Sequence, residues 1–181
     1  MKYKLTDVKI NFMGKTLFQI EAVKCFGDIV KGQKGGFIEK ESNLSQGGNA
    51  WVYGDAKVYG NAKVYGNAWV RGNAKVYGNA WVSGNAWVRG DAKVSGNAEV
   101  YGDAEVKGNA DYLVIGPIGS RNDITTFFKT ANNDIKVSCG CFTGTIEEFL
   151  EKVNETHGNN NYAKEYKTAV EIAKIHIFGG E

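Results

Sequence analysis

The sequence predicts a mainly β protein, in which a parallel β-helix of about four three-sided coils joins an N-terminal β region to a small C-terminal α/β domain with two helices. Three observations predict this fold. A six-residue repeat runs from Asn49 to Ala110, similar residues recur every 18 positions within it, and the pattern stops after Ala110. The 181 residues contain 24 glycines and one proline, and the even spacing of the glycines indicates repeats and not a flexible tail.

The first 37 residues are expected to form a small β region. Apolar-rich segments at Val8 to Phe12 and Leu17 to Phe26 flank Met13-Gly14-Lys15, which is typical of a hairpin turn. We expect this region to cover the first coil, because the open edge of a coil would otherwise pair with other chains.

Each hexad of the repeat reads (Asn/Asp)-Ala-x-Val-x-Gly and predicts a short strand followed by a sharp corner. Alternation places alanine and valine on one face of the strand and both x positions on the other, as in a half-buried strand. Glycine followed by Asn or Asp supplies the residue types that most easily adopt left-handed backbone angles. A helix is excluded, because a breaker would fall in every turn.

The number of sides of the coil follows from a longer period. In two of the three registers, the first x position of every third hexad repeats the same residue type: Trp51, Trp69 and Trp87 in one, and Lys57, Lys75 and Lys93 in the other. This period predicts three-sided coils in which residue i lies under residue i+18, about 4.8 Å away.

The repeat resembles the hexapeptide repeat of left-handed parallel β-helices, and the match covers Ile38 to Val106. The entry segment around Gly35-Gly36-Phe37-Ile38-Glu39 is similar to the opening of hexapeptide-repeat proteins of phages and prophages, which are often labelled polymer-forming. The resemblance implies the left-handed coil and a phage or prophage type of protein. We therefore expect three regions, at residues 1–37, 38–110 and 111–181.

The C-terminal region is predicted to be α/β. Tyr112 to Ile115 is a continuous apolar run, as in a strand buried on both faces, and further strands are predicted at Ile124 to Lys129 and Ile135 to Phe142. Thr145-Ile146-Glu147-Glu148 is a capping box, which predicts a helix from Ile146 to His157 that ends at Gly158. Tyr162 to Ile177 has the apolar spacing of a second amphipathic helix.

Composition narrows the function classes. The formal charge of +2 and the absence of a long apolar run argue against nucleic acid as the main partner and against a membrane span. Three cysteines without framework spacing favour free thiols in a reducing compartment, so we expect a cytoplasmic protein. No cofactor is expected.

An enzyme is the least favoured class. The resemblance suggests acyl transfer as one activity, which family members perform with a histidine base near an inserted loop. The repeat of this chain contains neither a histidine nor an inserted loop. Zinc-dependent carbonic anhydrase activity would need three histidines, and the chain has His157 and His176 alone. Regular threonine ladders, as in ice-binding helices, are also missing from the hexads.

A ligand site is predicted at the end of the first strand after the repeat. Glycines at a strand end let backbone N–H groups approach an anion, and an arginine can pair with phosphate. The predicted ligand-binding residues are Gly116, Gly119, Ser120, Arg121 and Asn122. The alternative is a tight turn whose arginine pairs with a neighbouring acid.

Two further groups of residues, the paired cysteines and the aligned tryptophans, each have a structural and a functional interpretation. Cys139 and Cys141 are two residues apart and are expected on one side of a strand, but without a second cysteine pair we predict no metal site. Aligned outward tryptophans with cations beside them are typical of a contact surface, so we predict a homo-oligomer interface at Trp51, Trp69, Trp87, Arg71 and Arg89, with a trimer as the expected state. Ligand recognition by stacking is the alternative.

These features favour a non-enzymatic oligomeric binding protein. The leading hypothesis is a phage-encoded antagonist of host defence that sequesters a nucleotide-like signal, with Arg121 as the anion contact. A direct protein–protein inhibitor of a host defence factor and a structural assembly protein are the alternatives.

Overall fold

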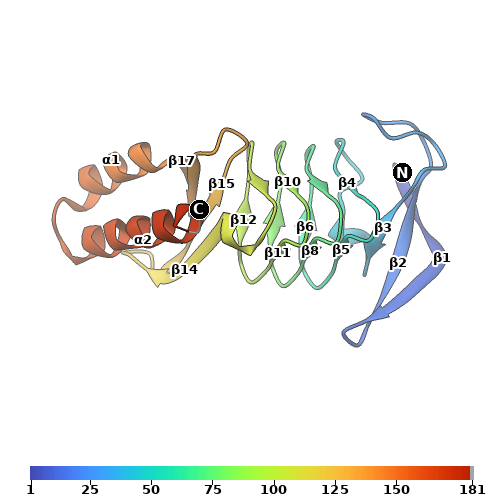
Figure 1. Cartoon of the computed structure of the whole chain (residues 1–181), viewed down its shortest axis with the longest axis horizontal. Helices are drawn as coiled ribbons and strands as arrows, with labels where there is room; N and C mark the ends of the chain where they lie inside the picture. Colours follow the sequence, from blue (N-terminus) through green and yellow to red (C-terminus); the bar gives the residue numbers. More distant parts are fainter. Residues whose placement is uncertain (180–181) are drawn as a thin grey trace.

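The computed structural model describes residues 1–179 and has three parts arranged along its long axis (Figure 1). A β-hairpin lies at one end, a coil of short parallel strands forms the middle, and a sheet with two helices closes the other end. In this part of the chain, neither helix combines the length and the apolar character that crossing a membrane requires.

The N-terminal hairpin joins the first sheet of the coil. Strands β1 (Tyr3–Phe12) and β2 (Lys15–Ala22) are antiparallel around a turn at Met13 and Gly14, as the sequence predicts. Strand β3 (Lys34–Ile38) pairs with β2 and then, in parallel, with the first strand of the repeat on its side of the coil. A short 3-10 helix at Glu41–Asn43 follows.

The repeat forms a parallel β-solenoid of about four turns, built from two-residue strands. Its strands are β4 (Trp51–Val52), β5 (Lys57–Val58), β6 (Lys63–Val64), β7 (Trp69–Val70), β8 (Lys75–Val76), β9 (Trp81–Val82), β10 (Trp87–Val88), β11 (Lys93–Val94), β12 (Glu99–Val100) and β13 (Glu105–Val106). They make three sheets, with β5, β8 and β11 in the first, β4, β7, β10 and β13 in the second, and β6, β9 and β12 in the third. Trp69 pairs with Trp87, 18 residues on, which confirms three-sided coils.

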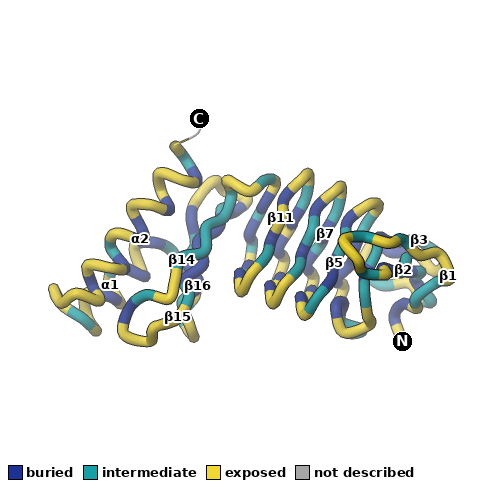
Figure 2. The backbone as a smooth tube through the Cα atoms, turned by 90° about the horizontal axis from the view of Figure 1, so that it is seen from below, coloured by how far each residue is buried: buried dark blue, intermediate teal, exposed yellow. Residues whose placement is uncertain are grey.

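Alanine and valine fill the interior of the solenoid. Every repeat alanine from Ala50 to Ala104 and every repeat valine from Val52 to Val106 is at most 1% exposed, whereas the corners face solvent (Figure 2). The corner asparagines stack, and the amide nitrogen of Asn79 donates to the amide oxygen of Asn97 at 3.0 Å. Hydrophobic burial and these amide ladders together hold successive coils in register.

An aromatic side chain is buried at each end of the solenoid. At the first coil, Tyr3 and Phe26 pack edge-on against Trp51 with ring centroids 6.2 and 5.4 Å away. Trp51 is therefore fully buried, and the prediction that it lies on an exposed strip with Trp69 is wrong, because the N-terminal region covers this coil. At the last coil, Phe128 joins the same buried cluster.

The C-terminal region is a four-stranded antiparallel sheet with two helices on one face. A 3-10 helix at Asn109–Asp111 leads into it. Its elements are β14 (Tyr112–Ile118), β15 (Asp123–Lys129), β16 (Ile135–Cys139), β17 (Phe142–Thr145), α1 (Ile146–His157) and α2 (Asn161–Phe178). Successive residues of β15 point to opposite faces of the sheet, since Phe127 packs with the helices and Phe128 packs on the solenoid.

One sequence-based prediction fails in this region, and another holds in part. The segment Ile135 to Phe142 is not one strand, because Gly140, with φ of +61°, and Cys141 form a turn between β16 and β17. The run Tyr112 to Ile115 has both faces covered, as predicted, since Tyr112 and Val114 pack on the solenoid cluster and Leu113 and Ile115 on the helix cluster, but its residues are only half-buried at this edge of the sheet.

Polar contacts attach the C-terminal sheet to the last coil. The ammonium of Lys136 lies 2.7 Å from the carboxylate of Asp103, and the hydroxyl of Ser138 donates to Glu99 at 3.0 Å. The backbone N–H of Ala131 donates to the carbonyl of Asp103 at 3.1 Å. The C-terminal region is thus fixed in orientation relative to the solenoid axis.

Candidate ligand-binding pocket

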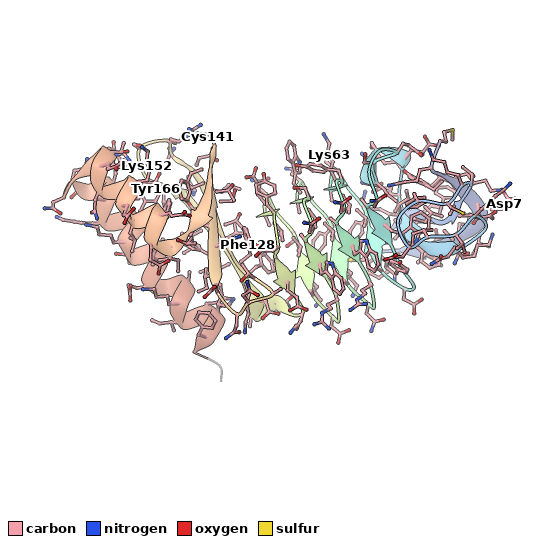
Figure 3. All side chains as sticks on the ribbon, turned by 90° about the horizontal axis from the view of Figure 1, so that it is seen from above. Asp7, Lys63, Phe128, Cys141, Lys152 and Tyr166 are labelled. Atoms are coloured by element: carbon pink, nitrogen blue, oxygen red, sulfur yellow. The ribbon has the colours of Figure 1, made fainter. Side chains whose placement is uncertain are left out.

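A cavity of about 500 Å³ lies at the end of the molecule away from the hairpin, between the C-terminal sheet and the two helices. The β14–β15 loop, the β16–β17 turn and both helices contribute to its wall. The lining residues are three basic side chains (Arg121, Lys152 and His157), two hydroxyls (Ser120 and Thr156), two thiols (Cys139 and Cys141), two aromatic rings (Phe142 and Tyr166) and Val153. Figure 3 shows Cys141, Lys152 and Tyr166 at this end of the molecule.

Tyr166 forms the buried part of the wall, and the β14–β15 loop passes directly over it. A Cβ atom at Gly119 would lie 2.0 Å from the hydroxyl oxygen of Tyr166, and Gly119 has φ of +68°, so no other residue fits this position. Burial, and then the neighbouring Cys139, raise the pKa of Tyr166 to about 12. The phenol, like that of any tyrosine, is neutral near pH 7 and can donate a hydrogen bond.

The basic side chains come from two directions. The guanidinium of Arg121 packs over the β16–β17 turn, where a Cβ at Gly140 would lie 3.0 Å from its Cζ atom. Lys152 and His157 come from the C-terminal half of α1. Nε2 of His157 lies 3.4 Å from the hydroxyl of Ser120, and its ring lies 5.9 Å from the Tyr166 ring at 31°. The site therefore combines basic groups with aromatic surface, and the ammonium of Lys152 also pairs with the carboxylate of Glu155 at 3.1 Å.

Only part of the predicted anion loop faces this cavity. Ser120 and Arg121 line it, whereas the backbone N–H of Gly119 donates to the carboxylate of Glu165 at 2.6 Å. That N–H is therefore not available to a ligand, and the expectation that it would bind an anion is wrong. Gly116 and Asn122, with φ of +153° and +50°, shape the turn and lie outside the lining.

Sequence reasoning did not assign the other residues of the pocket to a ligand site. Lys152 and Thr156 are four residues apart on α1 and therefore neighbours on the helix surface, which was a usable signal for that pair, whereas His157 points further round the helix. Phe142 and Tyr166 read as core residues, and only the tertiary structure shows that they border a cavity.

The two cysteines meet at this cavity for a different reason than expected. Cys139 ends β16 and Cys141 lies in the turn, so they do not share one side of a strand. Both still line the cavity, and both are free thiols. Across residues 1–179, no three His, Cys, Asp or Glu side chains gather as a metal site.

The predicted tryptophan surface is a stack within the chain itself. Trp69 and Trp87 are parallel, with centroids 5.5 Å apart and planes at 6°. Arg71 lies over Trp87 at 4.7 Å, and Arg89 pairs with Glu105. Trp87 is 37% exposed, so an apolar surface remains, but each ring already has partners in its own chain.

Comparison with known proteins agrees with the architecture. The chain matches the model of the YdcK beta solenoid repeat over residues 56–72 and 74–90, each segment close to one coil in length. Together with the three parallel ladders of strands that form the sides of the coil, this match identifies the chain as a β-solenoid protein. A comparison with curated proteins finds no match.

Proposed function

We propose that this protein is a non-enzymatic binding protein whose C-terminal pocket takes a small anionic ligand of the nucleotide type. The observation that carries the proposal is the gathering of Arg121, Lys152 and His157 with two aromatic rings around one cavity. Its volume of about 500 Å³ falls within the 300–1,000 Å³ usual for ligand pockets. The solenoid acts as a rigid support for this pocket.

The residues divide the recognition between charge and stacking. Arg121 presents a planar fork of donors that matches two phosphate oxygens, and Lys152 adds a point charge. The hydroxyls of Ser120 and Thr156 are further hydrogen-bonding groups on the same wall. Phe142 and Tyr166 supply aromatic surface against which a base could stack.

Calorimetric titration with nucleoside mono-, di- and triphosphates and cyclic dinucleotides tests the proposal. Loss of a charge-assisted hydrogen bond is worth about 1.5–3 kcal/mol, so Arg121→Ala should weaken binding by roughly ten- to a hundredfold. Lys164→Ala, an exposed lysine of α2 outside the cavity, is the matched control and should bind like the parent. Absence of heat with every nucleotide, or unchanged affinity in Arg121→Ala, would remove the assignment.

The wider role that we propose rests on the sequence resemblance to hexapeptide-repeat proteins of phages. In this role the protein is phage-encoded, acts in the bacterial cytoplasm as a homo-oligomer, with a trimer expected, and withholds a nucleotide-like signal from host defence. The exposed part of the Trp69 and Trp87 stack, with Arg71 and Arg89 beside it, is the proposed contact between copies.

The two alternative roles predict different measurements. A stoichiometric host protein captured from lysate would favour direct protein–protein inhibition. Filaments that lengthen with concentration would favour a structural assembly protein, whereas a discrete trimer in light scattering would support the proposed oligomer.

A further inference from the structure

The cavity that contains Arg121 also contains two of the three free thiols of residues 1–179. Cys141 is exposed in the turn, whereas Cys139 is half-buried and its sulfur accepts a hydrogen bond from the hydroxyl of Thr125 at 3.3 Å. Nucleotide binding gives these thiols no role, so they call for a separate explanation.

Two basic side chains line the same cavity as the thiols. The guanidinium of Arg121 packs against Gly140, the residue between the two cysteines, and Lys152 lines the same cavity. Thiols that react with disulfides typically occupy partly exposed, electropositive surroundings. Such surroundings also raise the local concentration of anionic reagents and so the rate of their reaction.

We infer that this cavity is a thiol–disulfide exchange site for small anionic disulfides, with oxidised glutathione as the probe of that class. Cys141 is the attacking group because it is exposed. Its thiol gives a proton to water, and the thiolate attacks one sulfur of the disulfide. A bond forms between Cys141 and one half of the reagent, while the other half leaves and takes up a proton as a free thiol.

Cys139 completes the exchange. Its thiolate attacks the sulfur of Cys141, the second half of the reagent leaves as a thiol, and a Cys139–Cys141 disulfide remains. The protein thereby loses two electrons and two protons, and the reagent gains both. Two residues of an extended strand separated by one residue have Cα atoms about 6.6 Å apart, and disulfides span about 4.4–6.8 Å. The turn at Gly140 shortens that separation, so the Cα distance does not prevent the bond, which also requires the two Cβ atoms to turn toward each other.

Cys25 provides an internal control. It is exposed, follows Lys24, and accepts a hydrogen bond from the backbone N–H of Lys31 at 3.4 Å, but it does not line the cavity. The reaction of the protein with oxidised glutathione at low salt is compared with its reaction with the neutral bis(2-hydroxyethyl) disulfide, and adducts at each cysteine are followed by peptide mass spectrometry.

We expect Cys141 to react with the anionic disulfide on the order of tenfold faster than Cys25 does, and with the neutral disulfide at a similar rate. Arg121→Gln should remove the preference of Cys141 for the anionic disulfide, whereas Lys164→Gln should keep it. The parent should release two thiol equivalents for each internal disulfide formed, and Cys139→Ser should stop at the mixed disulfide with one.

The anionic site would be overturned if Cys141 and Cys25 showed the same preference for the anionic over the neutral disulfide. It would also be overturned if that preference at Cys141 were unchanged in Arg121→Gln. A parent protein that accumulates the mixed disulfide at Cys141 without an internal disulfide would overturn the role of Cys139. The rate at Cys25 and the far-UV circular dichroism spectrum report whether each variant is folded. No nucleotide is present, so a failure of nucleotide binding and a failure of this inference are distinguishable.

Discussion

Replacing Gly84 by alanine should destabilise the solenoid more than the same replacement at Gly102, although both glycines occupy the same corner in successive coils. Their φ angles are +69° and +63°, so an alanine at either position would have a left-handed backbone. That conformation costs about 1–2 kcal/mol, and the lower entropy of the unfolded chain offsets about 0.4–1 kcal/mol of it. This part of the effect is common to both variants.

The difference comes from the neighbouring coil. A Cβ at Gly84 would lie 2.7 Å from the backbone nitrogen of Gly102 and 3.0 Å from its Cα, whereas a Cβ at Gly102 would meet nothing within 4 Å. Because backbone atoms form the obstacle, the coils themselves must move apart. Overpacking of this kind costs about 1–3 kcal/mol, and the free energy of unfolding should fall by that much more in Gly84→Ala than in Gly102→Ala.

Urea unfolding, followed by far-UV circular dichroism and tryptophan fluorescence, measures both free energies. The two signals must give coincident transitions with equal m-values, because a solenoid can also unfold coil by coil. Equal losses in the two variants would refute the reasoning, since the contact between coils would then not be what excludes a side chain from this corner.

Three further outcomes follow from the structure. Trp51→Ala should lower the free energy of unfolding by about 3–5 kcal/mol, and Trp87→Ala by clearly less, because only Trp51 is fully buried; comparable losses in urea unfolding would contradict the end-cap role. Phe128→Ala should cost a similar 3–5 kcal/mol by opening the other end of the coil, and thermal unfolding would show a lowered midpoint. Burial, with a smaller effect of Lys24, lowers the pKa of Lys2 from 10.5 to about 8. The unfolded chain then binds more protons above pH 8, so stability should rise from pH 8 toward about 10, and a slope that persists in Lys2→Met would exclude this lysine as its origin.

The solenoid was predictable because its information is local and repeated. Alanine and valine alternate with outward positions in every hexad, and the 18-residue period alone fixes which strands pair, as in Trp69 with Trp87. Helix α1 was predictable for a similar reason, since Thr145 accepts from the N–H of Glu148 in the capping box that the sequence contains.

The ends of the solenoid could not be predicted from the same period. Trp51 occupies an outward position of its hexad, and its burial depends on Tyr3 and Phe26, which lie outside the repeat. A periodic pattern carries no information about what covers its first member. The β16–β17 turn has a local signal, because a glycine at the first central position is typical of a two-residue hairpin turn, but the apolar residues on both sides of Gly140 favour one continuous strand.

The pocket depends on tertiary structure. Arg121 was recognisable as a possible anion contact, and Lys152 and His157 lie on the same helix, five residues apart. What brings them together is the sheet order β14-β15-β16-β17, which places the loop and the turn beside the same end of α1. That order follows from pairing between segments that the sequence shows only as separate apolar runs.

The architecture also explains why the candidate site lies outside the repeat. Successive coils of one sequence pattern present the same surface about every 4.8 Å, which suits ladders and stacks but not a cavity whose walls differ in chemistry. Such a cavity needs non-repeating segments. Strand β15 connects these segments to the coil, because its successive side chains point to opposite faces: Phe128 packs on the end of the solenoid and Phe127 packs beneath the helices. Adding or removing one coil should therefore change the distance between the two ends by about 4.8 Å and leave the cavity intact, whereas a change in β15 acts on the solenoid end and the pocket together.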